Sequence, residues 1–127
     1  MKIAKVLLAV FVLPAILMAC AENEGTSDKI SVVENYIAAT NEKNWDEAAK
    51  YLADDVEFYT PTGNCKGLDR CLGGPGGPDR EDPSNFSVEG NTVRWEIIVT
   101  FPDFEAPARG EAVVEDGKIQ VYRITAL

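Results

Sequence analysis

The sequence has 127 residues, with 21 acidic and 12 basic side chains, a net charge of −9 and no histidine. This length suits a single domain, the acidic surface repels nucleic acid, and the lack of histidine excludes imidazole catalysis, His-dependent triads and most transition-metal sites. The Gly-Pro run at residues 73–78 has no flanking strand, helix or lysine, so it is not a phosphate loop. We therefore expect no nucleic-acid partner, no metal and no cofactor.

Residues 1–19 have the pattern of a secretory signal peptide. Two lysines precede an apolar run from Val6 to Met18, which is broken only by Pro14. The run is about a dozen residues long, well below the roughly 20 that a membrane-spanning helix needs. Removing residues 1–19 takes away two lysines and no acid, so 10 basic and 21 acidic residues remain, a net charge of −11.

The end of this segment, Leu17-Met18-Ala19-Cys20, resembles the lipobox of bacterial lipoproteins. The resemblance implies that Cys20 carries the lipid, with palmitate among its acyl chains, and that Ala21 sorts the protein to the outer membrane, facing the periplasm. Several acyl chains, at about 0.8 kcal/mol per buried methylene, would hold the domain at a membrane. An ordinary signal peptide with Cys20 as a free thiol is the alternative. Residues 20–28 are small, polar and acidic, which favours a flexible tether.

Cys65 and Cys71 are an even pair once Cys20 is assigned to the lipid. In an oxidising periplasm such a pair is expected to form a disulfide. Six residues of helix would separate the two Cα atoms by about 9 Å, whereas a disulfide spans at most roughly 7 Å. If the bridge forms, residues 66–70 are therefore not one regular helix, and Gly67 provides the turn. Two free thiols or a metal site are the alternatives, and the metal is disfavoured because there is no close cysteine pair.

Two amphipathic helices are predicted in the first half of the domain. A capping box at Ser31–Glu34 and apolar residues at helical spacing predict a helix over residues 28–41. A second capping signal at Asn44–Glu47 predicts a helix over residues 45–53, with Trp45 as a core wedge at the junction. The acidic pair at 54–55 ends this helix, or alternatively forms an acid–base pair.

Strands are predicted in the rest of the chain. Residues 56–60 alternate, with Val56, Phe58 and Thr60 on the inner side. Residues 64–83 predict a long loop, either a lid or a disordered excursion, with the charged residues 79–82 in solvent. Further strands are predicted at 86–88, 92–101, 108–115 and 118–126.

The strand pattern also predicts which faces are buried. In the 92–101 strand, one face carries apolar residues at alternate positions: Val93, Trp95, Ile97, Val99 and Phe101. In the last strand, Ile119 and Tyr122 point to opposite faces, so one face is core and the other is a candidate dimer contact. Helices followed by an antiparallel sheet of about four to five strands predict an α+β domain at residues 29–127.

Most of residues 30–127 resembles the SnoaL-like and ketosteroid isomerase-like branch of the nuclear transport factor 2-like superfamily. The runs that carry the resemblance are VVENYIAATNEKNWDEAAKYLADDVEFYTPTG, FSVEGNTVRWEIIV and AVVEDGKIQVYRI. The resemblance implies a cone-shaped domain in which a curved sheet wraps the N-terminal helices around an apolar pocket, and which often dimerises through the sheet. It also implies a third helix, which is cut down here to a cysteine-bounded turn.

The isomerase members use an aspartate base, a helix tyrosine and a protonated aspartate. By resemblance, Tyr36 takes the place of the tyrosine, Thr60 that of the base and Gly110 that of the second acid, with Glu111 one residue away. A threonine hydroxyl does not accept a proton at neutral pH. The catalytic candidates Tyr36, Thr60 and Glu111 therefore favour a binding protein over an enzyme.

Three hypotheses follow for the function. The first is a non-catalytic domain at the membrane whose pocket binds a small apolar or amphipathic molecule, lined by Tyr36, Phe58, Thr60, Trp95 and Ile97. Tyr36 is alternatively a plain core residue. The second is an isomerase, cyclase or hydrolase, which needs a carboxylate of raised pKa inside the pocket. The third is an envelope interaction protein that uses the outer sheet face, where a homodimer would also form.

Overall fold

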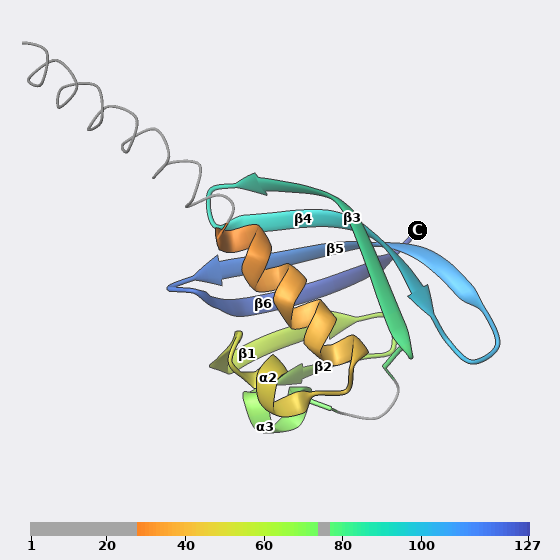
Figure 1. Cartoon of the computed structure of the whole chain (residues 1–127), viewed down its shortest axis with the longest axis horizontal. Helices are drawn as coiled ribbons and strands as arrows, with labels where there is room; N and C mark the ends of the chain where they lie inside the picture. The colour runs from red at the N-terminus through yellow and green to blue at the C-terminus, as the bar shows by residue number, and fades with distance from the viewer. Residues whose placement is uncertain (1–27, 74–76) are drawn as a thin grey trace, which may run out of the picture.

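The computed structural model describes residues 28–73 and 77–127. The signal peptide, the lipidation site Cys20 and most of the tether lie outside these residues. A long helix over residues 28–41, orange in Figure 1, lies across a curved sheet. Two short helices, α2 (Trp45–Ala49) and α3 (Leu68–Cys71), complete the helical part. Within the described ranges, no helix has the length and apolar character that crossing a bilayer requires.

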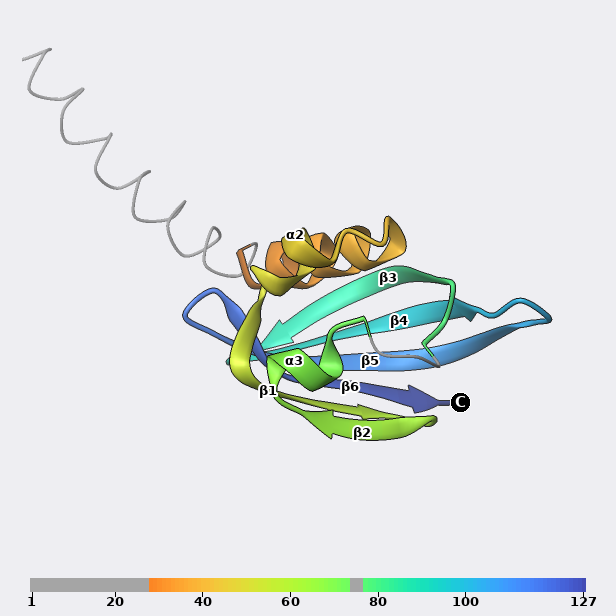
Figure 2. The ribbon, with the colours of Figure 1, turned by 90° about the horizontal axis from the view of Figure 1, so that it is seen from below.

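The sheet has six strands, against the four to five expected from the sequence. They are β1 (Leu52–Thr60), β2 (Gly63–Lys66), β3 (Arg80–Glu89), β4 (Thr92–Thr100), β5 (Glu105–Glu115) and β6 (Lys118–Ala126), in the order β2-β1-β6-β5-β4-β3. All neighbouring strands are antiparallel except β1 and β6, which run parallel. Figure 2 shows the sheet curling so that β3 approaches the helices on one face. The predicted α+β class is confirmed.

Two predicted boundaries are corrected by sheet pairing. The second helix ends at Ala49 and not at residue 53, because Leu52 pairs with Ile119 and starts β1. The predicted loop over residues 64–83 contains β2, α3 and the start of β3. Pro83, which lacks a backbone N–H, fits in β3 because β3 is an edge strand.

Two bulges decide which residues face the helices. In β3 the register shifts between Ser84 and Ser87, where Asn85 has φ 55°. In the β5–β6 pair, Val113 lies opposite Val121 but Val114 lies opposite Ile119. A bulge changes the alternation of the strand that carries it. Ile119 and Tyr122 are therefore both buried, whereas the sequence predicted opposite faces for them.

The core lies between the long helix and the concave face of the sheet. The helix contributes Val33, Tyr36 and Ile37, and β4 contributes the alternating residues predicted for it, of which Val93, Trp95, Ile97 and Val99 are buried. The prediction that Trp45 is a core wedge is wrong, because the residue is 38% exposed. The Lys43 ammonium lies 5.9 Å from the centroid of its ring.

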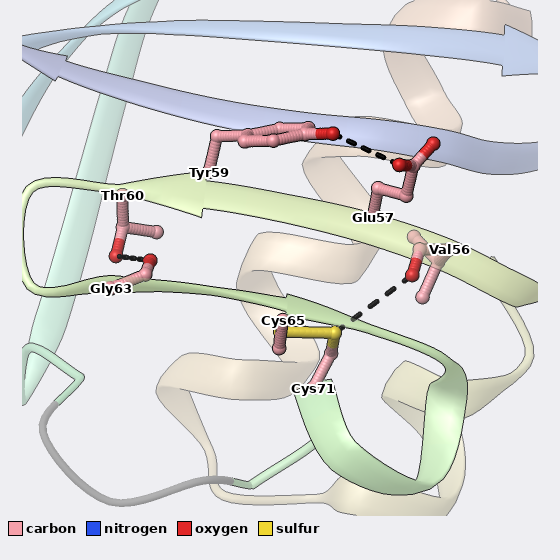
Figure 3. Close-up of a disulfide and its surroundings, with 7 residues drawn as sticks. All are labelled: Val56, Glu57, Tyr59, Thr60, Gly63, Cys65 and Cys71. Atoms are coloured by element: carbon pink, nitrogen blue, oxygen red, sulfur yellow. Dashed lines mark hydrogen bonds between the residues drawn. A yellow bond between two sulfur atoms is a disulfide. The ribbon is translucent and has the colours of Figure 1, made fainter.

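A disulfide joins Cys65 to Cys71 across the β2–α3 turn (Figure 3), with the two Cα atoms 5.5 Å apart. Gly67 separates strand from helix with φ 95°, a value that favours glycine. Its N–H donates to the Val56 carbonyl oxygen at 2.8 Å. The bridge therefore closes a turn that is also hydrogen-bonded to β1.

Candidate functional site

A cluster of aromatic side chains occupies the space between the long helix and the sheet. The Tyr36 ring lies 6.1 Å from Phe58 and 5.2 Å from Tyr122, and Phe58 stacks on Tyr122 at 5.1 Å. Trp95 lies 5.6 Å from Tyr122 and 5.7 Å from Phe86. We call these five side chains the aromatic cluster. Sheet register brings them together, because Phe58 and Tyr122 are directly opposite each other on β1 and β6.

Gly110 makes room for the indole of Trp95 on the neighbouring strand. The two residues are register partners in β4 and β5. A Cβ at Gly110 would lie 2.0 Å from Cε2 and 2.4 Å from Nε1 of Trp95. Gly110, which the sequence resemblance placed at the position of a second acid, therefore serves packing, because it lets a large aromatic ring lie against the strand.

Glu81 is the acid that reaches the cluster. It lies opposite Val99 on β3 and faces inward, and the Tyr122 hydroxyl donates to its Oε1 at 3.3 Å. Burial raises the pKa of Glu81 to about 7, while the Tyr122 hydrogen bond and the Lys43 charge act in the opposite direction. The carboxyl therefore exists in both protonation states near neutral pH.

The sequence-based interpretation of residues 79–82 as solvated charge is corrected for Glu81. The inward positions on β3 are Glu81, Pro83 and, past the bulge, Phe86 and Val88. This alternation is present in the sequence, but the proline and the bulge obscure it. Extending the period of two backward from Val88, with one extra residue at Asn85, would have identified Glu81 as inward-facing.

The end of the long helix holds Glu81 in place. The Asn41 side-chain amide donates to the Glu81 carbonyl oxygen at 2.8 Å and accepts from its N–H at 2.9 Å. Lys43 donates to the Asp79 carbonyl oxygen at 3.2 Å. These contacts fix the start of β3 and place a positive charge beside the carboxyl.

The two cluster tyrosines remain protonated donors. Burial, followed by the charge of Glu81, raises the pKa of both Tyr36 and Tyr122. Neither is available as a base at neutral pH. Tyr36 therefore lies near an acid, Glu81. This acid belongs to β3, whereas the resemblance placed the acids at Thr60 in β1 and Gly110 in β5.

The Trp95 indole N–H is buried without a partner. Trp95 is 3% exposed, and Nε1 is the one buried side-chain nitrogen or oxygen, within residues 28–73 and 77–127, that makes no hydrogen bond. A buried polar group without a partner is uncommon and costly. The Trp95 N–H in the cluster and the Glu81 carboxyl beside it thus have spare hydrogen-bonding capacity.

Two of the three catalytic candidates lie away from the cluster. The Thr60 hydroxyl donates to the Gly63 carbonyl oxygen at 2.7 Å in the β1–β2 turn (Figure 3). Glu111 points to the outer face, because Gly110 takes the inward position, and it pairs with Arg94 at 3.0 Å and Arg123 at 3.3 Å. The structure thus brings Tyr36, Phe58 and Trp95 together and separates Thr60 and Glu111 from them. Ile97 is buried in the same core.

The acidic pair at 54–55 does not form an acid–base site. Asp54 and Asp55 are both exposed and belong to β1, so they do not terminate a helix either. Among the described residues, no group of three or more acidic or cysteine side chains is placed to hold a metal ion.

The pocket expected behind Tyr36 and Thr60 is taken up by the rings of the aromatic cluster. Two surface hollows lie elsewhere. One, of about 440 Å³, is lined by Lys29, Asn91 and Asp116 among others. The other, of about 290 Å³, is lined by Asp54, Lys66 and Arg70 among others. A ligand of the cluster must therefore displace a side chain.

The outer sheet face, the predicted dimer contact, carries a charged network. Glu111 accepts hydrogen bonds from Arg94 and Arg123. The Arg123 guanidinium also lies 5.0 Å from the centroid of the Tyr59 ring. The outer face around Glu111 is therefore polar, and its charged side chains pair with one another.

No family model matches the chain, and no curated protein does. Solved structures, in contrast, do match the chain. An NTF2-like protein of unknown function from Cytophaga hutchinsonii aligns with a TM-score of 0.69 and 22% identity over 78% of this chain and 89% of its own. A putative ketosteroid isomerase from Kribbella flavida gives 0.70 and 19% over 80% and 79%. An LEH-like epoxide hydrolase from M. tuberculosis gives 0.63 and 19% over 79% and 83%.

The chain thus has the NTF2-like fold that the sequence resemblance implied. Identities near 20% show the fold alone. One fold serves many activities, so function has to be argued from the site.

Proposed function

We propose that this domain binds a small, mainly apolar molecule in the aromatic cluster, with the polar end of the molecule at Glu81. The observation that carries the proposal is the half-buried Glu81 carboxyl, which faces the aromatic cluster and accepts a hydrogen bond from the Tyr122 hydroxyl. A buried carboxyl costs free energy unless it is paired. Carboxyls whose pKa is raised by burial cluster at functional sites.

Ligand entry requires part of the cluster to move. Phe86 is half-buried and belongs to the edge strand β3, so it can be displaced without breaking a central strand. A flat ligand would replace its stacking on Trp95, an interaction worth about 0.5–1.5 kcal/mol. The site therefore favours flat, uncharged molecules with one polar group.

The place of action in this proposal is the periplasmic side of the outer membrane. The support comes from the N-terminal sequence: a signal peptide over residues 1–19, acylation at Cys20 and a tether up to residue 28. Metabolic labelling with a palmitate analogue tests this directly. We expect labelling of the full-length chain and none of a Cys20→Ala variant; equal labelling of both would contradict the anchor.

Binding is tested on a soluble domain that begins at residue 21. Its melting temperature is measured at pH 6 and pH 8 with a panel of uncharged aromatic and alicyclic compounds. We expect some compounds to raise the melting temperature, and Glu81→Gln to alter the effect and its pH dependence. Asp82→Asn is the matched control, because Asp82 is exposed and pairs with Arg80 at 2.9 Å. A panel without any stabilising compound would contradict the proposal.

The second candidate is an acid–base enzyme, favoured by the pKa of Glu81 of about 7. A group of this pKa both takes and gives a proton at neutral pH, which contributes typically 10²–10⁴-fold to a rate. The structural neighbours include a putative isomerase and an epoxide hydrolase, so double-bond isomerisation of an enone and hydration of an epoxide are the reactions to assay. Turnover that Glu81→Gln abolishes and Asp82→Asn retains would establish catalysis. Turnover equal in both variants would rule Glu81 out.

A further inference from the structure

We infer that the Trp95 indole N–H anchors the ligand through a hydrogen-bond acceptor, so that the ligand class is an uncharged, flat molecule bearing an acceptor nitrogen or oxygen. The inference rests on the proposed function and adds the chemistry of the ligand at a second point of the site. It stands on Trp95, Gly110 and their neighbours, and Glu81 adds only the repulsion of anions.

Trp95 Nε1 is a buried donor held in a fixed position. The backbone of Gly110 lies against the Cε2, Cζ2 and Nε1 atoms of the indole, and Tyr122 packs against the ring at 5.6 Å. An indole N–H only donates, and leaving it unpaired costs about 1–3 kcal/mol. An acceptor atom on a ligand would remove that cost.

The surroundings of Trp95 exclude a charged ligand. The neighbouring rings are apolar, and a charge placed among them would lose its hydration without gaining a counter-ion. An anion would also be repelled by Glu81 when that carboxyl is ionised. Tyr122 links the two polar points, since its ring packs on Trp95 and its hydroxyl bonds to Glu81.

The test compares benzonitrile with phenylacetylene, which have nearly the same shape but differ in that only the nitrile nitrogen is an acceptor. The soluble domain is labelled with ¹⁵N, and the two indole N–H signals are distinguished with a Trp45→Phe variant. We expect benzonitrile to move the Trp95 N–H signal downfield, and phenylacetylene at equal concentration to move it much less. The nitrile stretch of bound benzonitrile should show a hydrogen bond.

Trp95→Phe keeps an aromatic ring and removes the N–H. Because a net hydrogen bond contributes about 1 kcal/mol, we expect the ratio of benzonitrile to phenylacetylene affinity to fall about fivefold, and the nitrile stretch to lose its hydrogen-bonded shift. The ratio is used because the smaller ring changes the space available to both probes alike. A variant that does not fold is replaced by measuring the two probes on the unaltered domain alone.

The outcomes separate this inference from the proposed function. If both probes shift the Tyr and Phe signals of the cluster but affect the Trp95 N–H equally, the cluster binds ligands and the anchor is wrong. If neither probe shifts any cluster signal, both the proposed function and the anchor fail.

Discussion

Asn41 and Glu81 are joined by two hydrogen bonds, of 2.8 and 2.9 Å, across 40 residues of sequence. The side-chain amide of Asn41 takes the role of a missing neighbour strand, because β3 is an edge strand and pairs with β4 on one side only. It satisfies both backbone groups of Glu81 and connects the long helix to the sheet edge. The carboxyl is thereby directed toward Tyr122.

Asn41→Ala should loosen the start of β3. The variant leaves the N–H and carbonyl of Glu81 without their partner, which costs about 1–3 kcal/mol. We expect a lower free energy of unfolding and faster hydrogen exchange of the Glu81 amide. Asn64→Ala, at an exposed position of β2, is the control. An unchanged exchange rate at Glu81 would show that the two hydrogen bonds do not hold the strand.

Glu81 should make stability depend on pH. Its pKa is about 7 in the folded protein against an ordinary 4.5, so between these values the folded state binds more protons than the unfolded state. The free energy of unfolding therefore falls as pH rises from about 4.5 to 7. At 1.36 kcal/mol per pKa unit, the total change is at most on the order of 3 kcal/mol.

Denaturant unfolding at several pH values checks this contribution. Glu81→Gln has no titrating group at this position, so its stability should fall less steeply over that pH range. Asp82→Asn should keep the pH dependence of the unaltered protein. Parallel curves for Glu81→Gln and the unaltered protein would mean that the carboxyl is not enclosed.

Gly110→Ala should destabilise the domain strongly, although the substitution adds only one methyl group. A Cβ would lie 2.0 Å from the Trp95 ring, so the indole or the strand must shift. Overpacking of this kind costs about 1–3 kcal/mol. Gly77→Ala is the matched control, since a Cβ there meets nothing within 4 Å. Equal melting temperatures for the two variants would contradict the close packing of Trp95 on β5.

Removing the disulfide should lower stability moderately. Replacing both Cys65 and Cys71 by serine avoids a lone thiol and releases a short loop, which lowers the free energy of unfolding by about 2 kcal/mol in the chain-entropy account. The loss should appear as a lower denaturant midpoint. The bridge adjoins the aromatic cluster at one point, because Cys65 is the register partner of Phe58. The other four rings come from the long helix, β3, β4 and β6, so near-ultraviolet circular dichroism should stay close to that of the unaltered protein. A collapse of that signal would show that the β2–α3 turn supports the cluster.

Local patterns in the sequence predicted much of the scaffold. The helix over 28–41 and the last strand, Lys118–Ala126, have the predicted bounds, and the buried face of β4 follows the predicted alternation. These features depend on side-chain periodicity, which is a property of consecutive residues. The resemblance to NTF2-like proteins added the curved sheet.

Tertiary structure determined which residues come together in the site. Glu81 faces inward because an edge strand begins at Arg80 and carries a bulge at Asn85, and Tyr122 joins it because of a second bulge in the β5–β6 pair. A one-residue change of register moves a side chain to the other face of a sheet. Register is set by pairing between distant strands, so Glu81 could be placed from the sequence alternation only once the bulge at Asn85 was known. The sequence by itself determined the long helix, the C-terminal strands and the apolar face of β4, and the long-range pairing determined β2, the start of β3 and which polar groups meet inside.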